Sequence, residues 1–499
     1  MATPHTPQTT PQPLTLTEAL IPIASLIILV AISFYLFGDG GALGPNQVAL
    51  VVATMVALLV AWRRGHTLES LREAAVASIG SGIYAILILL AVGSLIGTWA
   101  MSGTLGAMVY YGLQLLSPNY FYMTACLICA IISASIGSSW TVAGTIGIGL
   151  MGIAVSMDLN PAIAAAAVIS GAYVGDTSSP LSDSANLAAA AAEVDLYEHI
   201  RETAITSGLS LIIALAVFFM LGQPGAFDAS EKMAALQSVF QPTLMLFVPL
   251  LVVLALAILK FPPFTTIFLG ALTAGLLAVI VAPERVIAFA DAGDGIPRPF
   301  LLLKGVWLAL ASGYKAETGY TMIDQLVTRG GMESMLNTIW LIITALAFGG
   351  VVEKAGVVER LIEPVIKAAK SAGSLVAATV GAVIATNIVT ADQFIAIVLP
   401  GRMFKSAFQS RGFAPVVLSR TIGAAGTPTG ALVPWNSCGA FLAATLGVPT
   451  MSFLPYAVFN FASPLLAIAF AYLGLRMVRA PATPKQASAP KVPPTGTMG

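Results

Sequence analysis

The chain has 499 residues, of which 57% are hydrophobic and only 9% are charged, and its formal net charge is zero. Soluble domains carry about 25% charged residues, so this composition excludes a large soluble protein and indicates an integral membrane protein. Apolar runs of about 20 residues, long enough to cross a bilayer, recur along the chain. The alternating pattern of outer-membrane strands is absent, and we predict an all-α, polytopic bundle of transmembrane helices.

The first predicted spans are Leu20–Phe37 and Gln47–Trp62. Residues 1–19 are polar and rich in proline and threonine, and they lack the basic segment of a cleaved signal peptide. We therefore predict a disordered N-terminus followed by a retained first helix. The cationic loop Arg63–Arg72 comes next, and the positive-inside rule places it, and with it the N-terminus, in the cytoplasm. Residues 479–499 have the composition of a disordered cytoplasmic tail.

The remaining spans predict two halves joined by a middle region. The first half covers residues 20–222 and contains a first repeat at about 79–202. Middle spans and a more polar connector occupy residues 223–337. A second repeat follows at 338–478, where we expect a basic loop over Arg402–Arg420.

A polar segment interrupts the apolar first half at Gly171–Leu187. It carries Asp176 and Asp183, four serines, a threonine and an asparagine, and Pro180 stands between the two acids. Proline removes a backbone donor and disrupts a helix. Such a segment is either a surface loop or a helix broken inside the membrane. Non-helical backbone is tolerated at membrane depth only where protein buries it or where it lines a water-filled cavity.

The second half has matching interruptions. One lies at Thr386–Gln393, where Asp392 is the only charged residue between Lys370 and Arg402. The other lies at Ala425–Gly439, which offers carbonyls and hydroxyls but no acid. An acid within a membrane segment is costly unless it faces a cavity.

The two halves align weakly with each other. Ile132–Thr141 falls against Val383–Asp392, and the segment from Pro180 falls against the one from Pro434. Equivalent loops of the two halves differ in cation content, so the positive-inside rule places them on opposite sides of the membrane. This pattern is typical of inverted repeats, which many secondary transporters use for alternating access.

The polar breaks have the chemistry of a cation site. Oxygen ligands suit a hard cation such as Na⁺, and Asp176, Asp183 and Asp392 would supply the negative charge. The neutral candidates are Ser179, Ser182, Asn186, Thr390, Thr427 and Asn436. Because one carboxylate holds either a proton or a metal ion, competition between the two gives antiport. The alternative is that the acids only cap helix ends at the membrane surface.

Several motifs resemble those of the NhaC-type Na⁺/H⁺ antiporters. They are Gly175-Asp176 with Ser179–Asp183, Thr390–Gln393, Leu399–Phe404, Leu418–Thr421 and Val433–Phe441. The resemblance covers residues 20 to 478, and it departs from the family at Thr177, where a basic residue is common, and at Ile422–Gly426, where acids are common. It implies membership of the ion-transporter superfamily, with scaffold and transport domains, an elevator-like movement and a homodimer.

These observations predict a secondary transporter, not an enzyme, in the cell inner membrane. We expect a Na⁺/H⁺ antiporter that exports Na⁺ (or Li⁺ or K⁺) in exchange for protons, without a cofactor beyond the transported ions and without a nucleic-acid partner. The alternative is a cation- or proton-coupled transporter of an organic acid or amino acid, because a solute carboxylate suits the N-terminus of a half-helix.

Overall fold

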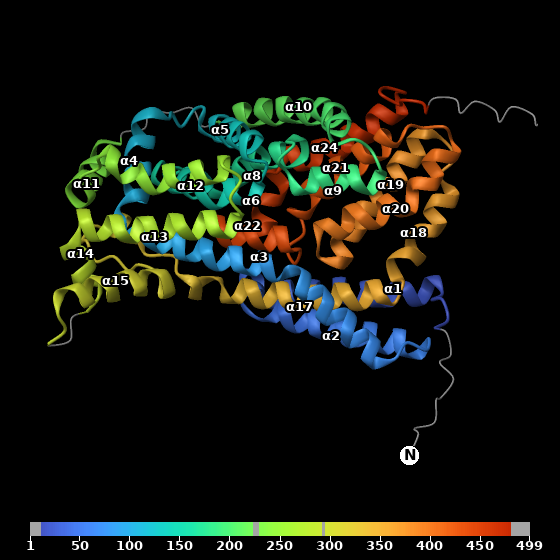
Figure 1. Cartoon of the computed structure of the whole chain (residues 1–499), viewed down its shortest axis with the longest axis horizontal. Helices are drawn as coiled ribbons and strands as arrows, with labels where there is room; N and C mark the ends of the chain where they lie inside the picture. The colour runs from blue at the N-terminus through green and yellow to red at the C-terminus, as the bar shows by residue number, and fades with distance from the viewer. Residues whose placement is uncertain (1–10, 223–228, 292–294, 481–499) are drawn as a thin grey trace, which may run out of the picture.

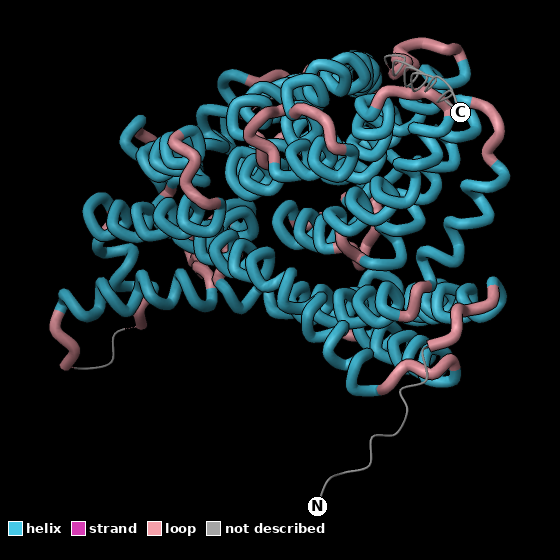
Figure 2. Tube along the Cα trace, turned by 45° about the vertical axis from the view of Figure 1, so that its right-hand side comes forward, coloured by secondary structure: helices cyan, strands magenta, loops and turns pink. Residues whose placement is uncertain are grey.

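The computed structural model of the chain describes residues 11–222, 229–291 and 295–480. Nearly every element in these ranges is a helix, and short loops connect the helices, as Figure 2 shows. β-pairing in the described ranges is confined to two isolated bridges, Tyr314 with Arg329 and Phe413 with Arg479. The all-α prediction is therefore confirmed.

Eight helical segments of the described part are long and apolar enough to cross a membrane. They are α1 (Leu16–Phe37), α2 (Pro45–Arg63), α3 (Leu68–Ser102), α6 to α7 (Ser139–Ser156), α10 (Leu196–Met220), α13 (Pro263–Val281), η4 with α17 (Met332–Lys354) and α19 (Ala372–Thr390). Two bent pairs raise the number to ten if each is one span: α11 (Ser230–Phe240) with η3–α12 (Leu244–Ile258), and α22 (Ser437–Leu446) with α23–η5 (Thr450–Tyr456). The chain is a multi-pass membrane protein.

The remaining α-helices of the described part do not meet the criteria for a complete span. They are α4 (Thr104–Leu115), α5 (Phe121–Ile136), α8 (Pro161–Ser178), α9 (Asp183–Ala192), α14 (Pro283–Phe289), α15 (Arg298–Ser312), α16 (Thr321–Val327), α18 (Val357–Ala368), α20 (Gln393–Ser410), α21 (Pro415–Gly430) and α24 (Val458–Tyr472). Part of the connector expected at 283–337 is thus helical, in α14, α15 and α16.

The expected basic loop over Arg402–Arg420 is largely helical, because α20 continues to Ser410 and α21 begins at Pro415. Two of its cations are paired with acids of the first half. Lys405 Nζ lies 2.5 Å from Glu193, and the buried Arg420 guanidinium lies 3.4 Å from Glu202. These ion pairs offset the free-energy cost of placing charges between packed helices. The sequence pattern did not reveal which acids would pair with these cations.

The helices form two groups in Figure 1. Helices α1, α2, α3, α13 and α17 lie along the lower half of that view, and α5, α8, α9, α10, α20, α21 and α24 lie in the upper half. The 35-residue α3 runs through the lower group and packs against both α13 and α17. Close approach to α3 requires glycine: the Gly331 N–H donates to the Gly93 carbonyl at 2.7 Å, and a Cβ at Gly97 would lie 2.2 Å from the Ala309 carbonyl oxygen.

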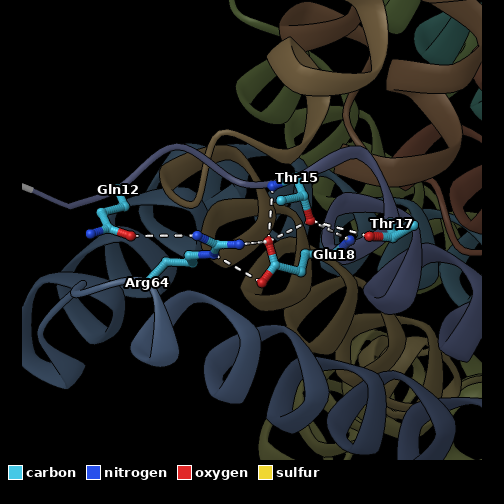
Figure 3. A network of polar contacts seen from close by, with 5 residues as sticks. All are labelled: Gln12, Thr15, Thr17, Glu18 and Arg64. Atoms are coloured by element: carbon cyan, nitrogen blue, oxygen red, sulfur yellow. Dashed lines mark hydrogen bonds and ion pairs between the residues drawn. The ribbon is translucent and has the colours of Figure 1, made fainter.

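A capping box begins α1, and Figure 3 shows its polar network. The Thr15 hydroxyl accepts from the Glu18 N–H at 3.3 Å, and the Glu18 carboxylate accepts from the Thr15 N–H at 2.9 Å. Arg64, directly after α2, also donates to Glu18 and fastens α2 to the start of α1. The helix therefore begins inside the range 1–19 expected to be disordered; residues 1–10 and 481–499 lie outside the described part.

Candidate cation-binding site

The two breaks of the first half touch each other. Helix α5 ends before Gly137, whose φ is +78°, and α8 ends before a non-helical stretch, 179–182, that leads into α9. A Cβ at Gly137 would lie 2.6 Å from the Leu181 carbonyl carbon and 2.7 Å from the Ser182 nitrogen. Only glycine allows both this backbone conformation and this approach. The break predicted at Gly171–Leu187 is therefore a real helix end, and it lies in contact with the end of α5.

The second half has the same arrangement of two touching breaks. Helix α19 ends at Thr390, Ala391 adopts a φ of +58°, and Asp392 caps α20. Helix α21 ends at Gly430, and α22 begins at Ser437. The Ser437 N–H donates to the Ala391 carbonyl at 3.0 Å, which joins the two breaks. The inverted relation between the two halves stays a prediction.

Asp176 lies in the last turn of α8, and its side chain accepts hydrogen bonds from three serines. Ser139, from the start of α6, donates to Oδ2. Ser182 and Ser184, from the start of α9, donate to Oδ1 at 2.8 and 2.9 Å, and they also reach the Asp176 carbonyl. The residue is only 6% exposed. Since a hydroxyl donates one proton and keeps two lone pairs, these serines orient the carboxylate and still offer oxygen to a cation.

A cavity of about 510 Å³ brings the three predicted acids together. Asp176 and Asp183 line it from the first half, and Asp392 lines it from the second. Asp392 also caps α20, because its Oδ1 accepts from the Phe394 and Ile395 N–H groups at 2.7 and 3.0 Å. The helix-cap alternative thus applies to Asp392, which nevertheless faces the cavity as well. Asp183, in the first turn of α9, is exposed.

The opposite wall of the cavity comes from the lower group of helices. Ser81 and Tyr84 contribute from α3, Leu346 from α17, and Lys260 and Phe261 from the turn between α12 and α13. The cavity therefore lies between the broken helices on one side and unbroken spans on the other.

The neutral candidates of the first half have different places. Ser182 contacts Asp176, as described. The Ser179 hydroxyl donates to the Ala134 carbonyl at 3.0 Å and ties the α8 break to α5. Asn186 is exposed, and its amide donates to the Ser182 carbonyl at 2.8 Å. Ser179 and Asn186 thus hold the break in shape.

The neutral candidates of the second half have separate hydrogen-bond partners. The Asn436 amide donates to the Asn387 carbonyl and to its side-chain oxygen, each at 3.1 Å. The Thr390 hydroxyl donates to the Thr386 carbonyl at 2.9 Å. The Thr427 hydroxyl is buried and has no hydrogen-bond partner among the described residues. The roles of all these residues as ion ligands stay predictions.

Sequence reasoning missed several residues of the site. Ser139 and Ser184 bond Asp176, and Cys438 lines the cavity beside them. The polar residues after Gly137 were a signal for Ser139. However, Ser139 precedes Asp176 by 37 residues in the sequence, so the contact between them could not be predicted. Trp140 stacks on Phe441 with ring centroids 4.1 Å apart, which joins α6 of the first half to α22 of the second.

Comparison with known proteins decides the family. A family model described as the Na⁺/H⁺ antiporter family matches residues 171–475, a range that includes all three cavity acids. The chain belongs to this family. It is 38% identical to the Na⁺/H⁺ antiporter NhaC of Alkalihalophilus pseudofirmus over 437 aligned residues. The alignment covers 86% of this chain and 90% of that relative.

Two relatives from Bacillus subtilis show the range of the family. The Na⁺/H⁺ antiporter NhaC is 32% identical over 458 residues, covering 90% of this chain and 96% of the relative. The malate-2H⁺/Na⁺-lactate antiporter is also 32% identical, over 466 residues, covering 92% of this chain and 95% of the relative. Resemblance to the NhaC type, noted from the motifs, is thereby confirmed.

Proposed function

We propose that this protein is a Na⁺/H⁺ antiporter that exports Na⁺ in exchange for protons. The observation that carries this proposal is the cavity in which both halves of the chain contribute acids, with Asp176 held by three serine hydroxyls. Similarity to relatives named Na⁺/H⁺ antiporters supports it. Li⁺ and K⁺ are the alternative ions, because they take the same oxygen ligands.

The exchange follows from competition for one set of oxygens. A buried carboxylate is costly unless a proton or a cation neutralises it. Na⁺ entering the cavity therefore displaces the proton from Asp176, and a returning proton displaces Na⁺. Ser139, Ser182 and Ser184 keep the carboxylate oriented in both states. Asp392 adds charge from the second half, and Asp183 attracts cations from its exposed position.

The surroundings of the transporter are also part of the proposal. Arg63 ends α2, Arg64 follows it and Arg72 lies near the start of α3, and these cations support a cytoplasmic side there. With them we propose that both termini are cytoplasmic and that the protein lies in the cell inner membrane. A homodimer and an elevator-like movement are part of the same proposal. Partners are then the lipid bilayer and the transported ions, with no cofactor and no nucleic acid.

A second candidate is a cation-coupled transporter of an organic acid or an amino acid. The cavity, about 510 Å³, is far larger than a metal ion needs, and Tyr84, Trp140 and Phe261 give it aromatic walls. Pockets of roughly 300–1,000 Å³ with such walls suit small organic ligands. One relative is named for malate and lactate exchange, which keeps this candidate open for the chain.

Everted membrane vesicles with a pH-sensitive dye distinguish the two candidates. Adding Na⁺ to wild-type vesicles should collapse a pre-formed pH gradient, and Asp176→Asn should abolish that response. Asp291→Asn is the matched control, because Asp291 is an exposed acid outside the cavity lining. No response of the wild type to Na⁺, Li⁺ or K⁺, together with counterflow of a labelled organic acid, would reject cation/proton antiport and favour the second candidate.

A further inference from the structure

One positive charge shares the cavity lining with the three acids. Of the four charged side chains in the lining that the structure describes, three are Asp176, Asp183 and Asp392, and the fourth is Lys260. Lys260 lies in the turn between α12 and α13, on the wall opposite the broken helices. Its side chain is exposed, and no described acid forms a salt bridge with it.

The backbone of this turn is well anchored. The Lys260 N–H donates to the Ala257 carbonyl at 3.0 Å, and the Thr266 hydroxyl donates to the Phe261 carbonyl at 3.2 Å. The Phe264 N–H lies 3.5 Å from the hydroxyl of Tyr84, itself a residue of the cavity lining. Pro262 and Pro263 restrict the backbone further. The turn thus fixes the backbone of Lys260 at the cavity. Only rotation about the bonds of its four-carbon side chain changes the position of the ammonium group.

The residue after the C-cap of α12 has a left-handed backbone, as is common where a helix ends. Lys260 adopts a φ of +63°, in the left-handed region that glycine occupies without strain. A glycine would form this turn more easily, so a lysine here costs stability.

We propose that Lys260 is a tethered counter-cation that competes with the transported cation for the acids of the cavity, and so sets the cation affinity. This inference rests on the proposed function of the same site. When the cavity holds no metal ion, the ammonium compensates part of the negative charge. An entering Na⁺ is repelled by the ammonium and must displace it from the acids. In a partly enclosed cavity, water and salt screen this repulsion less than at an open surface.

The test measures Na⁺ affinity in two ways, by half-maximal Na⁺ concentration in vesicles and by calorimetric titration of Na⁺ into the purified protein. We compare Lys260→Gln, Lys260→Gly and Lys260→Arg with the wild type. Lys304→Gln is the matched control, because Lys304 lies on α15 outside this cavity lining. The glycine variant removes the charge and relieves the backbone strain, so misfolding does not mask the result.

We expect the Gln and Gly variants to bind Na⁺ roughly 3- to 10-fold more tightly in both assays, which corresponds to weak repulsion at several ångströms. The Arg variant and the control should match the wild type. Equal affinity of wild type, Gln and Gly variants, or weaker binding in the variants, overturns the proposal. A wild type that binds Na⁺ but gives no vesicle response overturns antiport alone, because the calorimetric comparison still tests Lys260. If Lys260→Gln instead abolishes counterflow of a labelled organic acid without changing Na⁺ affinity, the lysine binds a solute carboxylate and the counter-cation role is wrong.

Discussion

Gly137→Ala is expected to force apart the two helix breaks of the first half. Its new Cβ would lie 2.6 Å from the Leu181 carbonyl carbon and 2.7 Å from the Ser182 nitrogen. Both are backbone atoms, so neither can move aside as a flexible side chain would. Because Ser182 also donates to Asp176, the displacement disturbs the hydroxyl cluster around that carboxylate.

Two costs add up in this variant. The φ of +78° at residue 137 costs an L-residue roughly 1–2 kcal/mol relative to glycine. Overpacking against rigid atoms typically costs about 1–3 kcal/mol. The free energy of unfolding should therefore fall by about 2–5 kcal/mol, and Na⁺-dependent collapse of the pH gradient should fall to a small fraction of the wild-type rate.

Thermal unfolding of the purified variant and the vesicle assay measure these two effects. Gly208→Ala in α10 and Gly381→Ala in α19 are matched controls, because a Cβ at either position meets no atom within 4 Å. Alanine is the better helix former, so the controls should be as stable as the wild type or slightly more. Wild-type stability and transport in Gly137→Ala would refute the reasoning from contact between the breaks.

Two further predictions separate charge from structure. Asp392→Asn keeps a good helix cap for α20 but loses the charge, so transport should fall while the melting temperature stays near the wild-type value. Asp392→Ala should lose transport and also about 1 kcal/mol of stability. Equal melting temperatures of the two variants would contradict the capping role. Thr15→Ala removes the capping box of α1 and should lower the free energy of unfolding by about 1 kcal/mol without changing vesicle transport. A loss of transport in this variant would place α1 in the mechanism.

The breaks themselves were readable from the sequence because polar residues and proline inside apolar runs have few permitted structures in a membrane. The sequence indicates three candidate acids, because a carboxylate within an apolar membrane segment is costly in free energy unless it faces a cavity. The structure places all three, Asp176, Asp183 and Asp392, around one cavity. The start of α1 was misplaced, although Thr15 and Glu18 have the spacing of a capping box. That signal was overlooked within a proline- and threonine-rich segment.

Contacts between distant segments could not be read from the sequence. Ser139 reaches Asp176 only because α5 and α8 pack side by side, and hydrophobic patterning does not specify which helices pair. The same holds for Lys260, which local sequence presents as an ordinary cation in a turn. Arg420 was expected in a loop, and its burial depends on Glu202 in another helix. Local residue chemistry was predictable, whereas partners across the fold required the structure.

The stack of Trp140 on Phe441 has a consequence for how the protein is made. Chains are synthesised from the N-terminus, and domains fold in that order. The break beside Trp140 is therefore in the membrane well before the helix that carries Phe441 is synthesised. Until then, the polar backbone around Gly137 and Ser182 lacks the cover that the second half provides. A chain that stops before α22 should therefore leave the Trp140 side of the first half without its packing partner, and we expect it to be inactive.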